Sequence, residues 1–176
     1  MILLIGPVSV GKTLLLKRLQ NSNPTSVKDD IPATIPTVGT NLVTVTSYKK
    51  MEVTVREMGG AMGPIWHNYY KDVHAVIFMI DISRQVQVAV ACVQLMTMLS
   101  HPFTKSVCVL LLLNKIDIPN GMSRSELDSL MRLEEVIKYA AQKITVLETS
   151  AKSGHNLDKV AKWIYEQNKL DESNAT

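Results

Sequence analysis

Gly6-Pro7-Val8-Ser9-Val10-Gly11-Lys12-Thr13 is the stretch of sequence that decides the fold. It matches the pattern G-x-x-x-x-G-K-[ST], in which a glycine-rich loop joins a strand to a helix. Residues 1–5 before it are all apolar and predict a buried strand, and residues 12–20 predict a helix. The loop N–H groups and the positive end of the helix dipole point to the same place, where they can bind an anion. The stretch therefore predicts a phosphate site.

Each residue type in this loop has a chemical task. Gly6 and Gly11 permit backbone angles and a close approach that a Cβ would obstruct. Lys12 is expected to reach the β- and γ-phosphates of a nucleotide, and the Thr13 hydroxyl to bind Mg²⁺, a cation that prefers oxygen. Phosphate contacts are expected at Gly6, Val8, Ser9, Val10, Gly11, Lys12 and Thr13. The alternative interpretation is a glycine turn that caps an ordinary helix.

The rest of the chain alternates apolar runs with helical stretches, which predicts an α/β fold. Strands are expected at residues 1–5, 42–46, 51–57, 73–81, 107–114 and 144–149, and helices at 12–20, 86–99, 134–142 and 157–168. Ser123 and Glu126 form a capping box for a further helix. We therefore expect a six-stranded, mostly parallel sheet with about five helices on both faces. A hairpin turn at residues 48–50 makes one edge strand antiparallel, and residues 21–40 are expected to form a loop.

Composition narrows the classes of protein. The 176 residues predict one domain over residues 1–170 and a short polar tail over 171–176. Scattered basic residues and a net charge of +3 argue against a nucleic-acid surface, and no apolar run is long enough to cross a bilayer. Cys92 and Cys108 fit no metal or disulfide framework. We expect a cytoplasmic monomer that reaches membranes, if at all, through partners.

Two further motifs predict recognition of a base. Asn114-Lys115-Ile116-Asp117 ends the most apolar strand, where ligands bind in open α/β sheets. The Asp117 carboxylate can accept two hydrogen bonds from guanine, whereas adenine offers no such donor pair. Asn114 is expected to support the site and the Lys115 stem to lie along the base. Ser150-Ala151-Lys152 follows the last strand and is expected to contribute the Ala151 N–H to guanine O6. Alone, the first motif is better explained as the polar end of a loop and the triplet carries almost no information, so both gain their value from their positions after the phosphate loop.

In this order the motifs resemble those of small GTPases of the Ras superfamily. The stretch Pro36-Thr37-Val38-Gly39-Thr40-Asn41 and the stretch Glu57-Met58-Gly59-Gly60 are similar to the two switches of the ADP-ribosylation-factor (Arf) branch. Pro64-Ile65-Trp66 and Tyr69-Tyr70 continue the second switch. The resemblance implies that Thr37 binds Mg²⁺ and the γ-phosphate, that the Gly60 N–H bonds the γ-phosphate, and that Glu57 holds Mg²⁺ through water. Loss of the phosphate would then release both segments. Ordinary turns and loops are the alternative interpretation.

Several positions depart from the Arf pattern. Ala61 stands where the family has the glutamine that orients the attacking water, and Val8 adds a β-branched side chain beside the phosphate. Glu57 replaces an aspartate. These departures predict slow GTP hydrolysis, unless another group positions the water. Partner proteins are expected near Thr37, Thr40, Arg56, Trp66 and Tyr69, although Thr40 and Arg56 replace aromatic residues of the family. Trp66 could anchor a partner or pack the second switch against the sheet.

The beginning of the chain also departs from the resemblance. Arf proteins carry a myristoylated amphipathic helix before the first strand, but Ile2 stands where myristoylation needs glycine. Either the switch acts on protein partners alone, or the sequence is a shorter start of a longer protein. The family implies a role in intracellular or ciliary traffic. A non-cycling GTP-binding module and an ATP-dependent P-loop kinase are the alternative functions, and the guanine-type motif argues against the kinase.

Overall fold

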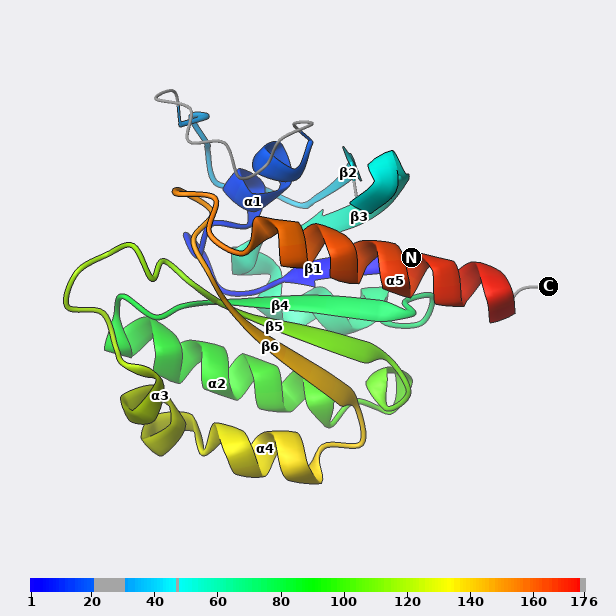
Figure 1. The fold of residues 1–176 in the computed structure, drawn as a ribbon. Coiled ribbons are helices and arrows are strands. Elements are labelled where there is room, and N and C mark those ends of the chain that lie inside the picture. The colour runs from blue at the N-terminus through cyan, green and yellow to red at the C-terminus, as the bar shows by residue number, and fades with distance from the viewer. Residues whose placement is uncertain (21–30, 47, 175–176) are drawn as a thin grey trace.

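The computed structural model of the chain describes residues 1–20, 31–46 and 48–174. Its centre is one six-stranded sheet in the order β2-β3-β1-β4-β5-β6 (Figure 1). The strands are β1 (Ile2–Ile5), β2 (Thr40–Thr46), β3 (Glu52–Met58), β4 (Ala75–Asp81), β5 (Cys108–Asn114) and β6 (Lys143–Thr149). Only β2 runs antiparallel to its neighbour, which confirms the predicted mostly parallel sheet with one antiparallel edge strand.

Helices cover both faces of the sheet. The α-helices of the described residues are α1 (Lys12–Leu19), α2 (Gln85–Leu99), α3 (Arg124–Met131), α4 (Leu133–Tyr139) and α5 (Leu157–Asn174). Short 3-10 helices are η1 (Tyr48–Lys50), η2 (Gly60–Tyr69) and η3 (Pro102–Thr104). In Figure 1, α1 and α5 lie on one face and α2, α3 and α4 on the other. The arrangement is the predicted α/β fold.

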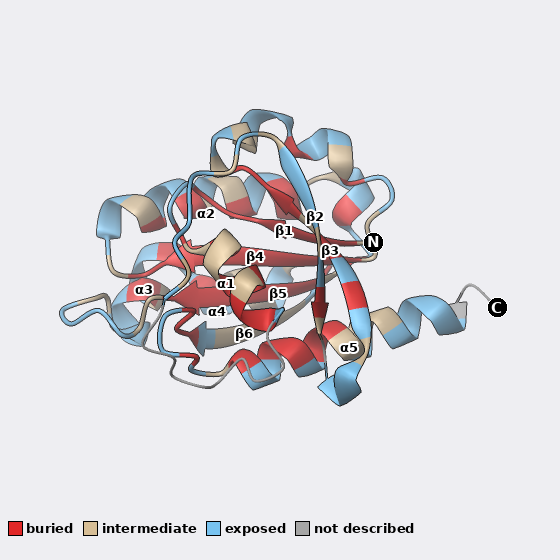
Figure 2. Cartoon of the chain, turned by 90° about the horizontal axis from the view of Figure 1, so that it is seen from above, coloured by how far each residue is buried: buried red, intermediate tan, exposed pale blue. Residues whose placement is uncertain are grey.

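The central strands are buried on both faces (Figure 2). Because successive side chains of a strand point to opposite faces, β4 contributes to two separate cores. One set packs toward α2 and the other toward α1 and α5; the first is Val76, Phe78 and Ile80, and the second is Ala75, Ile77 and Met79. β4 and β5 are therefore apolar at every position but their ends because both of their faces are buried.

The parallel strands place their carboxyl ends along one edge of the sheet. Gly6 follows β1, and Asp81 at the end of β4 is in register with Asn114 at the end of β5. Asn114 is in turn in register with Thr149, which ends β6. This edge therefore gathers the phosphate loop and both motifs predicted to read the base, although they lie far apart in the sequence.

The structure confirms the predicted capping box and corrects the predicted end of the last helix. The capping box at Ser123 is present, with both of its reciprocal hydrogen bonds to Glu126. The last helix was predicted to end at residue 168, but α5 continues to Asn174 and so includes residues 171–174 of the stretch that was predicted as a short polar tail. Tertiary contact explains the extension, because Asp171 Oδ2 lies 2.7 Å from Nδ1 of His74, the residue before β4. The loop predicted over residues 21–40 is irregular at 31–39, while residues 21–30 lie outside the described part.

Candidate functional site

The phosphate loop connects β1 to α1 as predicted. Gly11 is the N-cap of α1 and has a φ of 104°, a left-handed conformation that favours glycine. A Cβ at Gly11 would also lie 2.7 Å from Asn114 Nδ2, so glycine is needed here for close approach as well. The loop therefore packs directly against the end of β5.

Lys12 is buried at the base of this loop. Its Nζ donates to the carbonyl oxygens of Gly6 and Pro7, both at 2.8 Å. Burial lowers the pKa of the Lys12 ammonium to about 8, and the nearby Glu57 carboxylate acts in the opposite direction. The site therefore holds a cation in a low-dielectric environment, where a phosphate group would stabilise its charged form.

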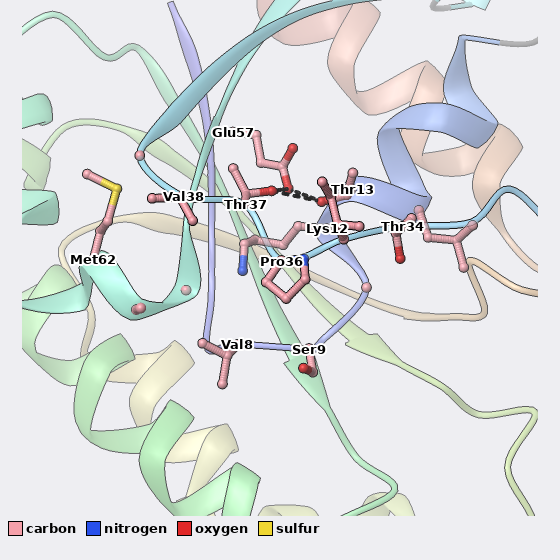
Figure 3. Close-up of a pocket in the computed structure, with 16 residues that line it drawn as sticks. Val8, Ser9, Lys12, Thr13, Thr34, Pro36, Thr37, Val38, Glu57 and Met62 are labelled. Carbon is pink, nitrogen blue, oxygen red and sulfur yellow. Dashed lines mark hydrogen bonds between the residues drawn. The ribbon is translucent and has the colours of Figure 1, made fainter.

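Three oxygen-bearing side chains from separate segments meet beside the loop (Figure 3). Thr13 Oγ1 donates to Glu57 Oε1 at 2.5 Å, and Thr37 Oγ1 donates to the same oxygen at 3.1 Å. The two threonine hydroxyls lie 3.1 Å apart. Glu57 is 1% exposed, and its Oε2 is buried without a hydrogen-bond partner among the described residues. An unpartnered buried carboxylate oxygen beside two hydroxyls suits a hard divalent cation.

The two predicted switch segments contact each other and the phosphate loop. The Gly59 N–H donates to the Gly39 carbonyl oxygen at 2.9 Å. A Cβ on Gly60 would lie 2.4 Å from the backbone nitrogen of Val8, so the second segment lies directly on the loop. The two switch segments and the phosphate loop therefore lie in direct contact with one another.

Trp66 packs the second segment against the sheet. Its side chain is 2% exposed and stands edge-on to Phe78 of β4, with ring centroids 6.3 Å apart. Its Nε1–H donates to the Gly59 carbonyl oxygen at 3.1 Å. The sequence left open whether Trp66 anchors a partner or packs the second switch against the sheet. In the structure Trp66 packs the switch.

A cavity of about 420 Å³ opens between the phosphate loop and these segments (Figure 3). Lys12, Thr13, Thr37 and Glu57 line it, and so does Gly60. The lining also has an apolar part, which is made by Val8, Ile35, Val38, Ala61 and Met62. Ala61 stands at the position where the family has glutamine. Ala61 can thus contribute no side-chain hydrogen bond within this cavity.

The motifs predicted to read the base come together around Asn114. Its Nδ2 donates to the Val10 carbonyl oxygen at 2.8 Å, and its Oδ1 accepts from the Ala151 N–H at 3.0 Å. Asp117 Oδ1 accepts from Ser150 Oγ at 2.6 Å. Asn114 is 2% exposed, whereas Asp117 lies at the surface, where its second oxygen can meet a ligand. The Ala151 N–H, predicted to donate to guanine, is here used by Asn114.

Sequence reasoning missed two buried charged residues that support this region. Asp81 is 1% exposed, and its Oδ2 lies 2.6 Å from Lys115 Nζ, while its Oδ1 accepts from Ser83. Arg18 is 3% exposed and donates from Nη2 to the Lys152 carbonyl oxygen. The signal for Asp81 was available, because it is the one charged residue at the end of an otherwise apolar strand.

The remaining predicted surface residues lie around the second segment. The Arg56 guanidinium lies 5.5 Å from the centroid of the Tyr69 ring, and Thr40 is exposed at the start of β2. Among the described residues, no group of three or more His, Cys, Asp or Glu is arranged for a metal. No helix within those residues is long and apolar enough to span a membrane.

Comparison with known proteins gives one consistent result. A family model described as the ADP-ribosylation factor family matches residues 1–168. Human ADP-ribosylation factor-like protein 16 is 45% identical over 167 residues, which cover 93% of this chain and 84% of the human protein. ADP-ribosylation factor-like protein 1 of Caenorhabditis elegans is 30% identical over 168 residues, covering 94% and 87% of the two chains.

A solved structure shows the same fold. It is that of the Arl6 BBS3 small GTPase from Trypanosoma brucei, with bound nucleotide analogue GppNp. The TM-score is 0.79 at 21% sequence identity, and the match covers 96% of both chains. Together with the phosphate loop and the base-type motifs on one sheet edge, the family match and the relatives lead to one conclusion. The chain belongs to the ADP-ribosylation factor family of small GTPases.

Proposed function

We propose that the protein is a guanine-nucleotide-dependent switch that binds GTP or GDP together with Mg²⁺. The observation that carries the proposal is the convergence of Thr13, Thr37 and Glu57 from three segments on one point beside Lys12. When bound, Mg²⁺ would offset the negative charge of the β- and γ-phosphates. Thr13 and Thr37 would bind it through their hydroxyls, and Glu57 through water.

Guanine preference rests on Asp117. Ser150 orients the carboxylate through one hydrogen bond to Oδ1, which leaves lone pairs on both oxygens to accept from the guanine N1–H and amino group. Asn114 links this loop to the phosphate loop, so base and phosphates would bind to one connected unit. Lys115, anchored by Asp81, would lie along the base, and the Ser150-Ala151-Lys152 loop would close its edge.

Switching follows from the contacts among the three segments. The Gly60 N–H would bond the γ-phosphate from its position against Val8, and Thr37 would sense the same phosphate through Mg²⁺. Loss of that phosphate removes the attraction that holds both segments at the cavity. Effector and regulator proteins would read the change at the surfaces near Thr37, Thr40, Arg56 and Tyr69, which lie over the buried Trp66.

Hydrolysis is proposed to be slow without a partner. Val8 and Ala61 both line the cavity, and neither can orient a water molecule for attack. The same observation favours a second candidate function, a GTP-binding interaction module that does not turn over. For the cellular setting we propose intracellular or ciliary traffic from the cytoplasm, on the basis of the family alone.

Nucleotide competition and turnover test the proposal. With a fluorescent GDP analogue bound in Mg²⁺, unlabelled GTP and GDP should displace it, whereas ATP should not. Chelation of Mg²⁺ should accelerate nucleotide release. Preferential displacement by ATP would contradict the guanine-nucleotide proposal. Single-turnover GTP hydrolysis then separates the two candidates, because only a cycling switch gains a measurable rate from an activating partner.

A further inference from the structure

Arg18 is a buried cation on the helix that begins with the phosphate-loop residues Lys12 and Thr13. It lies in the last turn of α1, and its side chain is 3% exposed. A guanidinium has N–H donors and no acceptor, so a buried one must be faced by oxygen atoms of the protein. The negative end of the α1 dipole lies at the same turn and stabilises the positive charge. The position of Arg18 therefore favours hydrogen bonds to nearby carbonyl groups.

One acceptor of Arg18 lies in the loop between β6 and α5, which was predicted to contact the base. Arg18 Nη2 donates to the carbonyl oxygen of Lys152 in this loop. The two residues are 134 positions apart in the sequence, yet the loop lies beside α1 (Figure 1). A hydrogen bond from a charged donor is stronger than one between neutral groups. The helix that carries the phosphate-loop residues therefore also holds the loop at the base.

The peptide group between Lys152 and Ser153 transmits this constraint. A trans peptide is planar, and its C=O and N–H bonds point in opposite directions. Because Arg18 fixes the direction of the Lys152 carbonyl, it also fixes the direction of the Ser153 N–H. That N–H donates to Ser150 Oγ at 2.9 Å. The positive charge of Arg18 also polarises the peptide, which strengthens the N–H as a donor.

The Ser150 hydroxyl passes the constraint on to Asp117. Ser150 is fully buried, and a hydroxyl has only one hydrogen to donate. Since Ser150 Oγ accepts from the Ser153 N–H, its own hydrogen points elsewhere, and it is donated to Asp117 Oδ1 at 2.6 Å. The Asp117 side chain is exposed, and the terminal torsion of an aspartate has a broad energy minimum. The hydrogen bond from Ser150 therefore strongly restricts the directions in which the carboxylate oxygens face.

The loop also has internal hydrogen bonds that fix Ser150. The Ser150 carbonyl oxygen accepts from the Gly154 N–H at 2.9 Å, and the Ser150 N–H donates to the His155 carbonyl oxygen at 3.3 Å. Both bonds hold the backbone of Ser150, but neither involves the peptide group between Lys152 and Ser153. Arg18 acts on that peptide from outside the loop. A loop that is rigid by itself and a loop that depends on Arg18 therefore predict different results for the same variant.

We infer that Arg18 is a positioning residue for guanine recognition, which orients the Asp117 carboxylate through the peptide between Lys152 and Ser153 and through Ser150. The inference rests on the proposed function, because the orientation of Asp117 matters only when the ligand is a guanine nucleotide. Its consequence is that α1 serves both ends of the site. Lys12 and Thr13 at its beginning act on the phosphates, and Arg18 in its last turn acts on the base.

GDP and inosine diphosphate (IDP) provide the probes. IDP keeps the N1–H of the base but lacks the 2-amino group, so it donates one hydrogen bond to Asp117 where GDP donates two. Competition against a fluorescent GDP analogue in Mg²⁺ measures the affinity of the full chain for each. Wild type should prefer GDP by roughly tenfold or more, which is the contribution of a hydrogen bond to a charged acceptor.

Arg18→Met should lower this preference for GDP. The substitution removes the donors and keeps an apolar side chain of similar length, and an apolar replacement of a buried charge is commonly compatible with folding. Without Arg18 the carboxylate is free to turn, so the second hydrogen bond from guanine weakens while the single bond from IDP is retained more easily. We expect the ratio of the two affinities to fall by about threefold or more.

Matched variants separate positioning from a general structural role. Loss of folding would weaken GDP and IDP binding by the same factor and leave their ratio unchanged. Arg18→Lys keeps a charged donor and should retain more of the GDP preference than Arg18→Met. Lys17→Met removes the neighbouring cation of α1, whose Nζ donates to the Ala33 carbonyl oxygen at 2.6 Å, and should leave the ratio at its wild-type value.

A double-mutant cycle with Ser150→Ala tests the route of the effect. Ser150→Ala removes the last donor before Asp117 and should itself lower the preference for GDP. Adding Arg18→Met should then change the ratio no further, because both substitutions act on one carboxylate. Independent effects of the two substitutions, which multiply, would overturn the inference.

An unchanged ratio in Arg18→Met, with a wild type that prefers GDP, would overturn the inference and leave the proposed guanine recognition intact. Equal binding of GDP and IDP to wild type is a different result. It would contradict guanine recognition by Asp117 itself, and the role of Arg18 with it.

Discussion

Asn114 and Val10 are separated by 104 positions in the sequence, yet Asn114 Nδ2 donates to the Val10 carbonyl oxygen across 2.8 Å. The Oδ1 atom of the same side chain accepts from the Ala151 N–H at 3.0 Å. One buried amide therefore joins the phosphate loop to both loops that were predicted to read the base. The phosphate-binding and base-binding halves of the proposed nucleotide site are therefore connected directly through the Asn114 side chain.

Removing this amide should loosen both halves at once. Asn114→Ala leaves a buried carbonyl and a buried N–H without partners, which should lower the free energy of unfolding by about 1–3 kcal/mol. GDP affinity should fall as well. Chemical denaturation and GDP titration measure the two effects, with the exposed Asn68→Ala as the matched control. Unchanged stability in Asn114→Ala would show that the amide is not a structural link.

Glu57 should affect stability and metal dependence in opposite directions. Its buried Oε2 has no hydrogen-bond partner among the described residues, so Glu57→Gln removes a costly buried charge. The variant should unfold at the same or a higher denaturant concentration in EDTA. Its nucleotide should nonetheless be released at nearly the same rate with and without Mg²⁺. Glu52→Gln, at an exposed position of the same strand, should retain the wild-type Mg²⁺ dependence. A parallel loss of stability in EDTA would contradict this account.

Asp81 should act on the base through Lys115. The ion pair of 2.6 Å joins a fully buried carboxylate to a partly exposed ammonium, and the solvent access of Lys115 limits its contribution. Asp81→Asn should weaken GDP and GTP binding by the same factor, about tenfold, because both share the guanine base. A double-mutant cycle with Lys115→Met measures the coupling between the two residues. Additive effects would show that Asp81 does not position Lys115.

Trp66 should report the nucleotide state by its fluorescence. Its indole N–H contacts the Gly59 carbonyl, next to the Gly60 N–H that we expect at the γ-phosphate. Exchange of GDP for a non-hydrolysable GTP analogue should therefore change the emission intensity. Trp66→Phe should remove the change, whereas Trp163→Phe should keep it, because Trp163 lies in the other core with α5. A signal that survives in Trp66→Phe would refute this assignment.

Ala61→Gln should restore the ability to orient water. The glutamine side chain would enter the cavity beside Val8, where the wild-type residue offers no hydrogen bond. Single-turnover GTP hydrolysis should rise by about tenfold or more relative to wild type. Ala61→Leu supplies comparable bulk without polarity and should produce no increase. An equal rate in wild type and Ala61→Gln would place the control of hydrolysis elsewhere.

Features with a local cause could be predicted from the sequence. The phosphate loop is a contiguous motif, and its glycines, lysine and threonine are each expected to contact the phosphates or the Mg²⁺ of one ligand. The two-sided burial of β4 follows from its unbroken apolar run, and the capping box from the spacing of Ser123 and Glu126. The order of the motifs was enough to indicate the family, and the family model confirms it.

Features with a long-range cause required the fold. No local pattern shows that Asn114 bonds Val10, that Asp81 pairs with Lys115, or that Trp66 packs on Phe78. The sequence also placed the end of α5 too early, because the residues that extend it are held by a contact with His74.

The same division applies to the surface of α2. The sequence by itself determined that α2 is apolar, but an apolar helix is compatible with complete burial. Only the tertiary structure decided that Val86, Val90 and Val93 face solvent, because the sheet can cover one side of a helix and no element of the described part of the chain covers the other. The residue types of the motifs therefore determined which ligand the site can bind. The packing of distant segments determined where the phosphate and base motifs meet and which side of α2 is exposed to solvent.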